Sequence, residues 1–431
     1  MKLSSNFAEI PQPTPASRGV FTACDGTPAL RSRDKKSSVC ERDRNTAKTV
    51  IYFTLPSYIN TMIYLDNAAT GGFKPLSVQN AVFASLKACA NPGRSGHRLS
   101  LALSERVFSC RRLLCDLFGG YGYDRVVFTK NCTEALNIAL LGTFCKGDHV
   151  VTTCLEHNSV LRPLEYLKQT GVIEYDVAPL ENGKLTADGV LSLVKENTRA
   201  VCVTSASNVT GQCPDLAEIR RGLSDGVLFF VDGAQGAGHI PLDMKRLGID
   251  ALAIAGHKGM HAIQGAGALL FSERINPRPV LYGGTGSESF SLNMPAFYPD
   301  ALESGTLSYP AVCSLFEGAI VVKTMREEGA QTLFKLTKAL HTALSAMPHY
   351  TMYFEPNPCG IASFAHENIP SEELAGLLSD RFDIAVRGGQ HCAPLVHRAL
   401  GTDNGLVRAS FSPFQTVREV NALVGALKKI G

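Results

Sequence analysis

The chain has 431 residues, of which 45% are hydrophobic and 19% are charged, as in ordinary globular enzymes. Its formal net charge of +3 is too small to favour nucleic acid or an acidic membrane surface as a partner. No apolar run approaches the roughly 18 to 20 residues that span a bilayer, so we expect no membrane partner either.

Thirteen cysteines are many, but their spacing does not predict a metal site. No Cys-x-x-Cys pair occurs, and no cysteine lies near a histidine pair at zinc-ligand spacing. The odd count and the lack of an apolar signal segment after Lys2 favour a reducing compartment. We therefore expect a cytoplasmic protein without a bound metal.

Residues 1–61 differ in composition from the rest of the chain. They combine several prolines with a polar, charge-mixed stretch at 31–48, and they show little periodicity before Val50. This composition predicts a disordered or non-native N-terminal extension. Patterned sequence begins directly after Met62, where we place the ancestral start of the protein.

From Met62 onward, short apolar runs alternate with helical patterns. The predicted strands lie at 126–128, 149–151, 200–203, 227–231 and 251–254. Continuous apolar strands separated by helices are typical of a mostly parallel sheet that is buried on both faces. A long helical stretch at 313–344 and a mixed region follow. We therefore predict an α/β fold, with a large α/β domain at 75–309 and a smaller α+β domain at 62–74 and 310–431.

In parallel sheets, functional groups gather where strands end, and polar residues follow the first two predicted strands. Asn131 can cap a helix, with Glu134 completing a capping-box-like pair. The free amides of that helix end suit a phosphate, although every capped helix has such an end. His157 can stack on an aromatic cofactor and move protons, or it can be a structural histidine.

Asp232 and Lys258 follow two later strands. A buried strand-end carboxylate is costly unless it meets a cation, and a protonated pyridine nitrogen is such a partner. The alternative is that Asp232 caps a helix or pairs with a lysine. Lys258 lies between Gly256 and Gly259, which allow close approach of a bulky group, and a desolvated lysine attacks aldehydes. A surface lysine in a glycine-rich loop is the alternative here.

Together, these four features are similar to the cofactor site of fold-type I pyridoxal-phosphate enzymes. The region from Tyr64 to the C-terminus resembles the class V aminotransferase superfamily, specifically its cysteine desulfurase and selenocysteine lyase branch. The motifs that carry the resemblance lie at 65–69, 133–137, 156–158, 207–211, 232–235 and 256–258. The resemblance implies a fold-type I PLP-dependent transferase with pyridoxal 5'-phosphate (PLP) as its cofactor.

The resemblance also implies roles around the cofactor ring. Lys258 would form the Schiff base and shuttle the Cα proton of the substrate. His157 would stack on the ring, Asp232 would pair with the pyridinium, and Gln235 would hydrogen-bond the ring oxygen.

The cofactor phosphate has its own implied residues. The backbone at Cys132 and the side chains of Thr133 and His257 would hold it. Thr306 is similar to the threonine that reaches a neighbouring subunit's phosphate in this family, which implies a homodimer with shared sites. Ala255 departs from the family pattern, in which a serine or threonine is common. Its methyl group implies either looser cofactor binding or another donor.

The segment 387–393 indicates the reaction, because it resembles the desulfurase loop in which a cysteine follows an arginine and a histidine. Cys392 would be the nucleophilic thiolate; a buried, inert cysteine in a glycine turn is the alternative. Arg387 and Arg408 would bind the substrate, with Arg408 pairing its carboxylate. Asn208 would contact both the carboxylate and the cofactor.

We therefore predict a cysteine desulfurase that converts L-cysteine to L-alanine and carries the sulfur on Cys392 as a persulfide. A small thiol or a sulfur-acceptor protein would then collect that sulfur. A selenocysteine lyase acting on L-selenocysteine is the nearest alternative. Another class V enzyme, such as a C–S lyase, transaminase or epimerase, would not need Cys392. An idle scaffold is a further alternative, which the presence of Lys258 and Cys392 supports poorly.

Overall fold

The computed structural model describes residues 62–88, 90–93 and 95–431. The extension predicted over 1–61 lies outside these described residues and stays a prediction. Within the described ranges, no helix is both long enough and apolar enough to cross a membrane.

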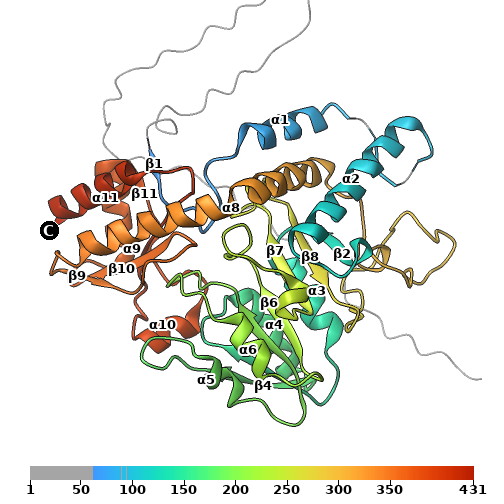
Figure 1. Ribbon diagram of the computed structural model, residues 1–431, viewed down its shortest axis with the longest axis horizontal. Coiled ribbons are helices and arrows are strands. Elements are labelled where there is room, and N and C mark those ends of the chain that lie inside the picture. The colour runs from blue at the N-terminus through green and yellow to red at the C-terminus, as the bar shows by residue number, and fades with distance from the viewer. Residues whose placement is uncertain (1–61, 89, 94) are drawn as a thin grey trace, which may run out of the picture. The chain divides into compact units, whose positions relative to one another are not determined.

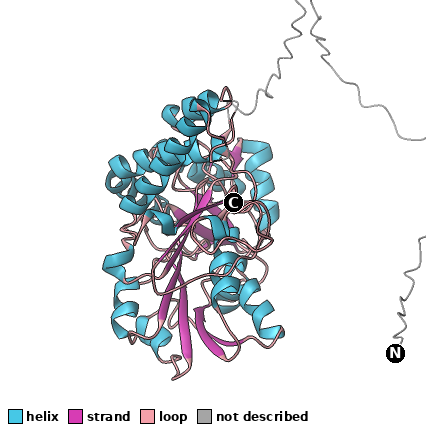
Figure 2. Cartoon of the chain, turned by 90° about the vertical axis from the view of Figure 1, so that its right-hand side faces the viewer, coloured by secondary structure: helices cyan, strands magenta, loops and turns pink. Residues whose placement is uncertain are grey.

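A central sheet organises the first part of the described chain (Figures 1 and 2). Its strands are β2 (Val126–Thr129), β3 (Asp148–Thr153), β4 (Ile173–Ala178), β5 (Thr198–Thr204), β6 (Leu228–Asp232), β7 (Ala251–Ala255) and β8 (Gly267–Phe271). Their order is β2-β8-β7-β6-β5-β3-β4. The β8 strand runs antiparallel to both of its neighbours, and the other pairs are parallel. The predicted α/β fold with a mostly parallel sheet is confirmed, although the sequence analysis did not identify β4 and β8.

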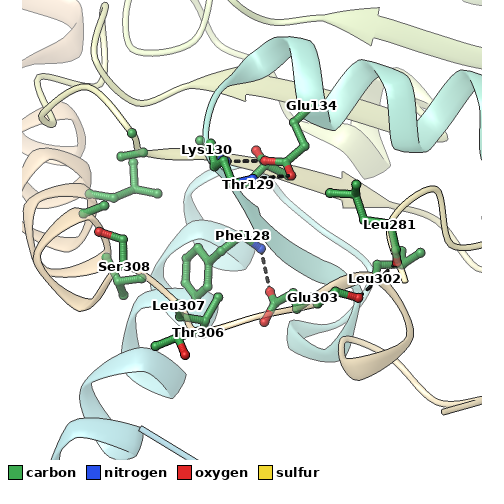
Figure 3. Close-up of a pocket in the computed structure, with 17 residues that line it drawn as sticks. Phe128, Thr129, Lys130, Glu134, Leu281, Leu302, Glu303, Thr306, Leu307 and Ser308 are labelled. Atoms are coloured by element: carbon green, nitrogen blue, oxygen red, sulfur yellow. Dashed lines mark hydrogen bonds and ion pairs between the residues drawn. The ribbon is translucent and has the colours of Figure 1, made fainter. Parts of the chain in front are cut away.

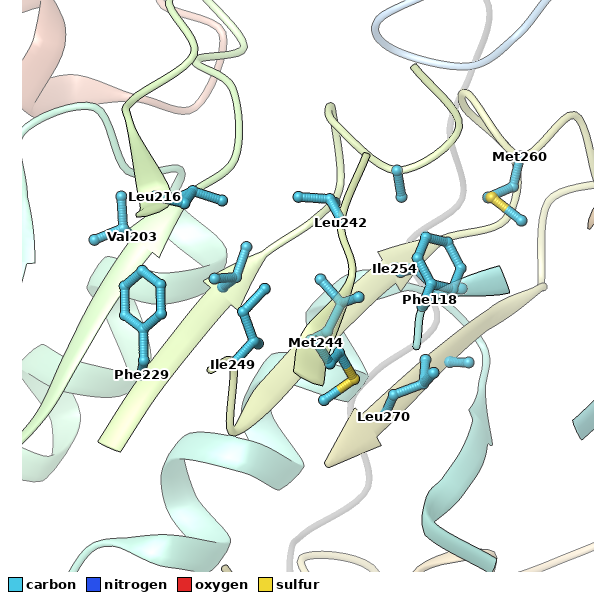
Figure 4. Close-up of a cluster of buried hydrophobic side chains, with 14 of the residues drawn as sticks. Phe118, Val203, Leu216, Phe229, Leu242, Met244, Ile249, Ile254, Met260 and Leu270 are labelled. Atoms are coloured by element: carbon cyan, nitrogen blue, oxygen red, sulfur yellow. The ribbon is translucent and has the colours of Figure 1, made fainter. Parts of the chain in front are cut away.

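Apolar clusters cover both faces of this sheet, because successive side chains of a strand point to opposite faces. Along β5, Val201 and Val203 join one cluster, whereas Ala200 and Cys202 join the other. Figure 4 shows part of the first cluster, in which Phe229 of β6 lies near Val203. Burial on both faces therefore explains why these strands are continuous apolar runs.

Helices alternate with the strands, and α3 and α4 begin within a few residues of a strand end. In this part of the chain they are α2 (Arg98–Leu117), α3 (Cys132–Thr143), α4 (Asn158–Gln169), α5 (Ala187–Leu191), α6 (Leu216–Gly222) and α7 (Met244–Leu247), with short 3₁₀ turns η2 (Tyr123–Arg125) and η3 (Asp300–Leu302). The side chain of Asn131 caps α3 and that of His157 caps α4. Each cap satisfies a backbone N–H of the first helical turn, and so fixes the loop between strand and helix.

The C-terminal region is built around a smaller antiparallel sheet, ordered β12-β10-β9. Its elements are α8 (Tyr309–Leu344), β9 (Tyr350–Met352), β10 (Ile361–His366), α9 (Ser371–Phe382), β11 (Ile384–Ala385), α10 (Pro394–Leu400), β12 (Val407–Ser410) and α11 (Val417–Ile430). The strand β1 (Ile63–Tyr64) pairs with β11, and α1 (Leu76–Ser85) contacts α8. The predicted helix at 313–344 is confirmed as part of α8, whereas the predicted domain boundaries stay predictions.

Candidate active site

Residues at or just after the ends of several central strands line a cavity of about 240 Å³. The predicted site residues in this lining are Cys132, Thr133, His157, Asn208, Asp232, Gln235, His257, Lys258, Arg387 and Arg408. Thr306 and Cys392 are not part of the lining that the described residues form. The fold thus brings together positions that lie far apart in the sequence.

Asp232 and Lys258 both line the cavity and interact electrostatically. Asp232 is 4% exposed, and its Oδ1 accepts hydrogen bonds from the Ala234 N–H at 2.8 Å and the Cys132 thiol at 3.4 Å. Burial lowers the pKa of Lys258, and the nearby Asp232 carboxylate opposes that shift. A lysine with a lowered pKa is more readily deprotonated and nucleophilic. The alternative of a surface lysine does not fit a position in the cavity lining, where the amine is desolvated. Asp232 both caps a turn and acts electrostatically on the lysine.

The ring of His157 is fixed by its neighbour Ser159. Its Nδ1 accepts the Ser159 N–H at 3.0 Å and lies 2.5 Å from Ser159 Oγ. Because Nδ1 is an acceptor, the proton of the neutral ring belongs on Nε2. Burial lowers the pKa of His157 to about 4, although Asp232 opposes this shift. The ring is therefore neutral at pH 7, which suits stacking against a cofactor.

The N-terminus of α3 forms the end of the cavity suited to an anion. Asn131 Oδ1 accepts the Glu134 N–H at 2.9 Å, as the sequence predicted. In a complete capping box, the Glu134 side chain would accept the N–H of the cap residue Asn131. Here Glu134 Oε2 instead accepts the N–H of the preceding residue, Lys130, at 2.6 Å. The Thr133 hydroxyl lies 3.3 Å from that of Ser159. The cap is therefore present, but it is not a complete capping box.

The residues present fit pyridoxal phosphate. In the cavity lining, Lys258 supplies an amine, Asp232 a buried carboxylate, and Thr133 a hydroxyl at the α3 N-terminus. His257 Nδ1 and Asn208 Oδ1 are buried and have no hydrogen-bond partner among the described residues. Buried polar atoms without partners are rare in folded proteins and point to a missing ligand.

Two further cavity residues bear on the cofactor. Gln235 Nε2 donates to the Ala68 carbonyl at 3.0 Å, which leaves the second N–H of the amide for a ring oxygen. Ala255 ends β7 with its methyl group in the cavity lining. Its side chain has no hydrogen-bond donor. The position at which this chain departs from the family pattern therefore lies in the candidate cofactor site.

Arg408 lies on β12 and is only 1% exposed. Its Nη2 contacts Asp66 Oδ1 at 2.8 Å, and its Nη1 donates to the Asn208 carbonyl at 3.0 Å. The Asp66 carboxylate balances the buried guanidinium charge, and the remaining donors can bind a substrate carboxylate. Arg387 is held beside it, because the two residues exchange backbone hydrogen bonds of 3.1 and 2.8 Å.

The Cys392 loop is anchored against the cavity. The Asn158 N–H donates to the Cys392 carbonyl at 2.8 Å, and Asn208 Nδ2 donates to the His391 carbonyl at 2.7 Å. His391 and Cys392 have φ values of 50° and 58°, a left-handed conformation that is uncommon for such residues. His391 is buried and lines the cavity, whereas Cys392 is exposed. The alternative of a buried cysteine does not fit this exposure, and the role of Cys392 as the nucleophile stays a prediction.

Thr306 lies in a separate pocket, shared with Lys130 of the loop before α3 (Figure 3). The Glu303 carboxylate holds this segment, because it accepts two hydrogen bonds from Arg111 and one from the Phe128 N–H, each at 2.6 Å. Thr306 thus lies near the α3 N-terminus without lining the cavity of its own chain. Its role at a neighbouring subunit's phosphate stays a prediction.

Three residues that the sequence analysis did not single out support the site. Ser159 orients His157, and Asp66 neutralises Arg408 from a position 342 residues away. Glu156 is fully buried, and this burial raises its pKa to about 8. The sequence feature that could have indicated Glu156 is a charged residue shortly after an apolar strand. No local pattern could have indicated the pairing of Asp66 with Arg408.

Comparison with known proteins agrees with this geometry. The aminotransferase class-V family model matches residues 63–423. A probable cysteine desulfurase of Methanothermobacter thermautotrophicus is 33% identical over 386 residues, which cover 85% of this chain and 94% of that protein. Cysteine desulfurase CsdA of Escherichia coli is 30% identical over 391 residues, which cover 87% and 95%. An apo structure of cysteine desulfurase from Thermococcus onnurineus matches with a TM-score of 0.80 and 31% identity, over 86% and 95% of the two chains. This chain therefore belongs to the class V aminotransferase family, in its cysteine desulfurase branch.

Proposed function

We propose that this protein is a PLP-dependent cysteine desulfurase in which Cys392 receives the sulfur of L-cysteine and L-alanine is released. The observation that carries the proposal is one cavity lined by both Lys258 and Asp232, with the Cys392 loop hydrogen-bonded to the lining residue Asn208 through the His391 carbonyl. The names of the relatives, all cysteine desulfurases or probable ones, support the same reaction.

Different residues of the cavity would bind the cofactor, bind the substrate carboxylate and transfer the Cα proton. When bound, PLP supplies a carbonyl that condenses with amines and a ring that takes up the electron pair released at Cα. Asp232 would stabilise positive charge on the ring nitrogen, and neutral His157 would stack on the ring. With the cofactor and substrate bound, the Lys258 amine would be the group that accepts and returns the Cα proton. Arg408 would hold the substrate carboxylate.

The sulfur step belongs to the protein's own thiol. The Cys392 thiolate attacks the substrate sulfur, so that an S–S bond forms on Cys392 and the Cβ–S bond breaks. The electron pair of the broken bond stays with the substrate carbon, which takes up a proton to become the methyl group of L-alanine. Because Cys392 is exposed, a small thiol or an acceptor protein can then remove the outer sulfur.

The proposal includes a homodimer in a reducing, cytoplasmic setting. The segment next to the Thr306 pocket exposes large apolar side chains, which are usual at subunit interfaces. They are Leu281, Tyr282, Phe290, Leu292 and Phe297. A neighbouring subunit on this segment would also bring Thr306 to the cavity of that second subunit.

The proposed reducing compartment would keep Cys392 as a thiol.

The proposed division into domains is 75–309 for the large domain, and 62–74 with 310–431 for the small one. A separate apolar cluster supports it, because this cluster combines Leu65 with residues from 333 to 427. The clusters on the two faces of the central sheet are distinct from it.

The testing experiment incubates the purified chain with L-cysteine and a thiol reductant and follows sulfide and alanine together. We expect equimolar products, a loss of both in C392A, and full activity in C145A, which removes another exposed cysteine. Activity that survives in C392A would overturn the nucleophile.

A second function, selenocysteine lyase, is favoured by one observation: Cys392 is exposed and does not line the cavity formed by the described residues. Selenium is a better leaving group than sulfur, so a reaction on L-selenocysteine depends less on a nearby thiol. Comparing rates on the two amino acids in wild type and C392A separates the two functions. Selenocysteine turnover that persists in C392A, with no turnover of L-cysteine by wild type, identifies the lyase.

A further inference from the structure

Two thiols outside the candidate active site lie in contact. The Sγ atoms of Cys213 and Cys359 are 3.8 Å apart, although the residues are 146 positions apart in the chain. Cys213 follows β5, and Cys359 lies between β9 and β10. Neither residue has a part in the proposed desulfurase reaction.

The two thiols differ in their exposure to reagents. Cys213 is partly exposed and lines a groove of about 510 Å³, together with Tyr353 and Pro358. Cys359 is only 5% exposed and does not line this groove. The hydrogen bond from Cys359 lowers the pKa of Cys213, which favours the more reactive thiolate form. A dissolved oxidant therefore meets Cys213 first.

The pair lies directly behind the candidate cofactor cavity. Cys213 and Cys359 pack with Ala68 and Ala206, and both alanines line the cavity. Cys213 also lies in the loop between β5 and α6, which carries Asn208. A covalent bond at this place would tie that loop to the C-terminal region.

We propose that Cys213 and Cys359 form a reversible disulfide when the protein meets a low-molecular-mass disulfide such as oxidised glutathione. The Cys213 thiolate attacks one sulfur of that disulfide and releases one molecule of thiol, which leaves a mixed disulfide on Cys213. Cys359 then loses its proton and attacks the Cys213 sulfur, which releases the second molecule of thiol. Two electrons pass from the thiol pair to the oxidant, and a reducing thiol reverses both steps.

The bond would change the protein measurably. Disulfide sulfurs lie about 2.05 Å apart, so the two loops must draw closer than the present contact of 3.8 Å. A bond across this long stretch of chain restricts the unfolded state. We expect the melting temperature to rise by about 5 °C. The formation of the disulfide does not depend on the proposed function. Only the significance of tying the Asn208 loop to the C-terminal region rests on that function.

The test uses the full chain with the C392S change, because the exposed Cys392 would itself react with the oxidant. The protein is treated with oxidised glutathione, free thiols are alkylated, and peptides are mapped by mass spectrometry under non-reducing conditions. C213S and C359A are made in the same background, and C145S serves as the matched control for an exposed cysteine. Melting temperature is measured before and after oxidation, and again after reduction.

We expect a peptide pair linked through Cys213 and Cys359, a reversible rise in melting temperature, and the loss of both in C213S and C359A but not in C145S. The linked peptides in the protein with both cysteines do not depend on how well either variant folds. A mixed disulfide on Cys213 with Cys359 still open to alkylation after unfolding would overturn the proposal. So would a failure of both thiols to react.

Discussion

The two ends of the candidate site are built in different ways. The cofactor end rests on the ends of central strands: the buried Asp232 is the last residue of β6, and Lys258 lies in the turn that follows β7. The sulfur-transfer end is a loop, in which His391 and Cys392 have left-handed backbone conformations and the thiol is exposed. Binding and orienting a cofactor requires rigid support, whereas a thiol that must also meet an outside acceptor needs an accessible loop. Substitutions at the two ends should therefore impair different steps: cofactor binding at one end and sulfur transfer at the other.

The largest effect should come from K258A, which removes the amine from the cavity. We expect loss of the bound yellow cofactor and a fall in kcat of at least about 10³-fold. K168A, which changes an exposed lysine in a surface ion pair, is the control and should behave as wild type. A K258A protein that still turns over L-cysteine near the wild-type rate would contradict the assignment.

D232N should have the next largest effect, because it keeps the shape of the side chain but removes its charge. We expect kcat to fall by about 10²-fold while the chain still folds. Absorbance of the bound cofactor and steady-state kinetics provide the measurement. Near wild-type activity would mean that Asp232 serves mainly to cap the turn at Ala234.

G388A should disturb the sulfur-transfer loop and leave the cofactor end intact. A Cβ at Gly388 would lie 2.5 Å from the Ser371 carbonyl oxygen, so the loop must shift. We expect sulfide formation to fall by about tenfold or more with unchanged cofactor absorbance. G376A is the control, because a Cβ there meets nothing within 4 Å. Loss of cofactor in G388A would show that the two ends are not separable.

Acid should destabilise the cofactor end through its buried imidazoles. Burial lowers the pKa of His157 and His257 to about 4 and that of His261 to about 3. Below about pH 6.5 the unfolded chain binds protons that the folded chain does not. The contribution of these imidazoles to the free energy of unfolding should therefore be constant above that pH and fall as the pH drops towards 4.

H261N tests this account with a residue that tolerates the φ of 56° at this position. Denaturant unfolding between pH 7 and 4.5 should show a slope smaller by about 1 kcal/mol per pH unit than in wild type. An unchanged slope would mean that His261 is not held neutral in the folded protein.

The smallest effect should come from A255S, which restores a hydroxyl at the end of β7. One added hydrogen bond is worth about 2- to 10-fold in affinity. Titration of the apoprotein with pyridoxal phosphate measures the change. Weaker binding in A255S would mean that another donor already satisfies the phosphate and that the hydroxyl crowds the site.

The sequence predicts the cofactor end better than the sulfur-transfer end, and the reason is physical. Strands that are buried on both faces are continuous apolar runs. Short stretches of sequence are therefore enough to identify β5, β6 and β7 and the polar residues after them. The β4 strand was missed because it is an edge strand with mixed burial. The exposure of Cys392 depends on its anchors at Asn158 and Asn208, which are distant in the chain. Contacts of this kind leave no local pattern.

The central claim is that Cys392 alone receives the sulfur, and one measurement tests it most directly. The protein is mixed with one equivalent of L-cysteine without reductant, quenched, and mapped by mass spectrometry while alanine is counted. We predict one added sulfur atom on Cys392 for each alanine released, and neither product in C392S. Alanine formed with the added sulfur on Cys132, whose thiol lies in the cavity beside Asp232, or on no cysteine at all, would contradict it.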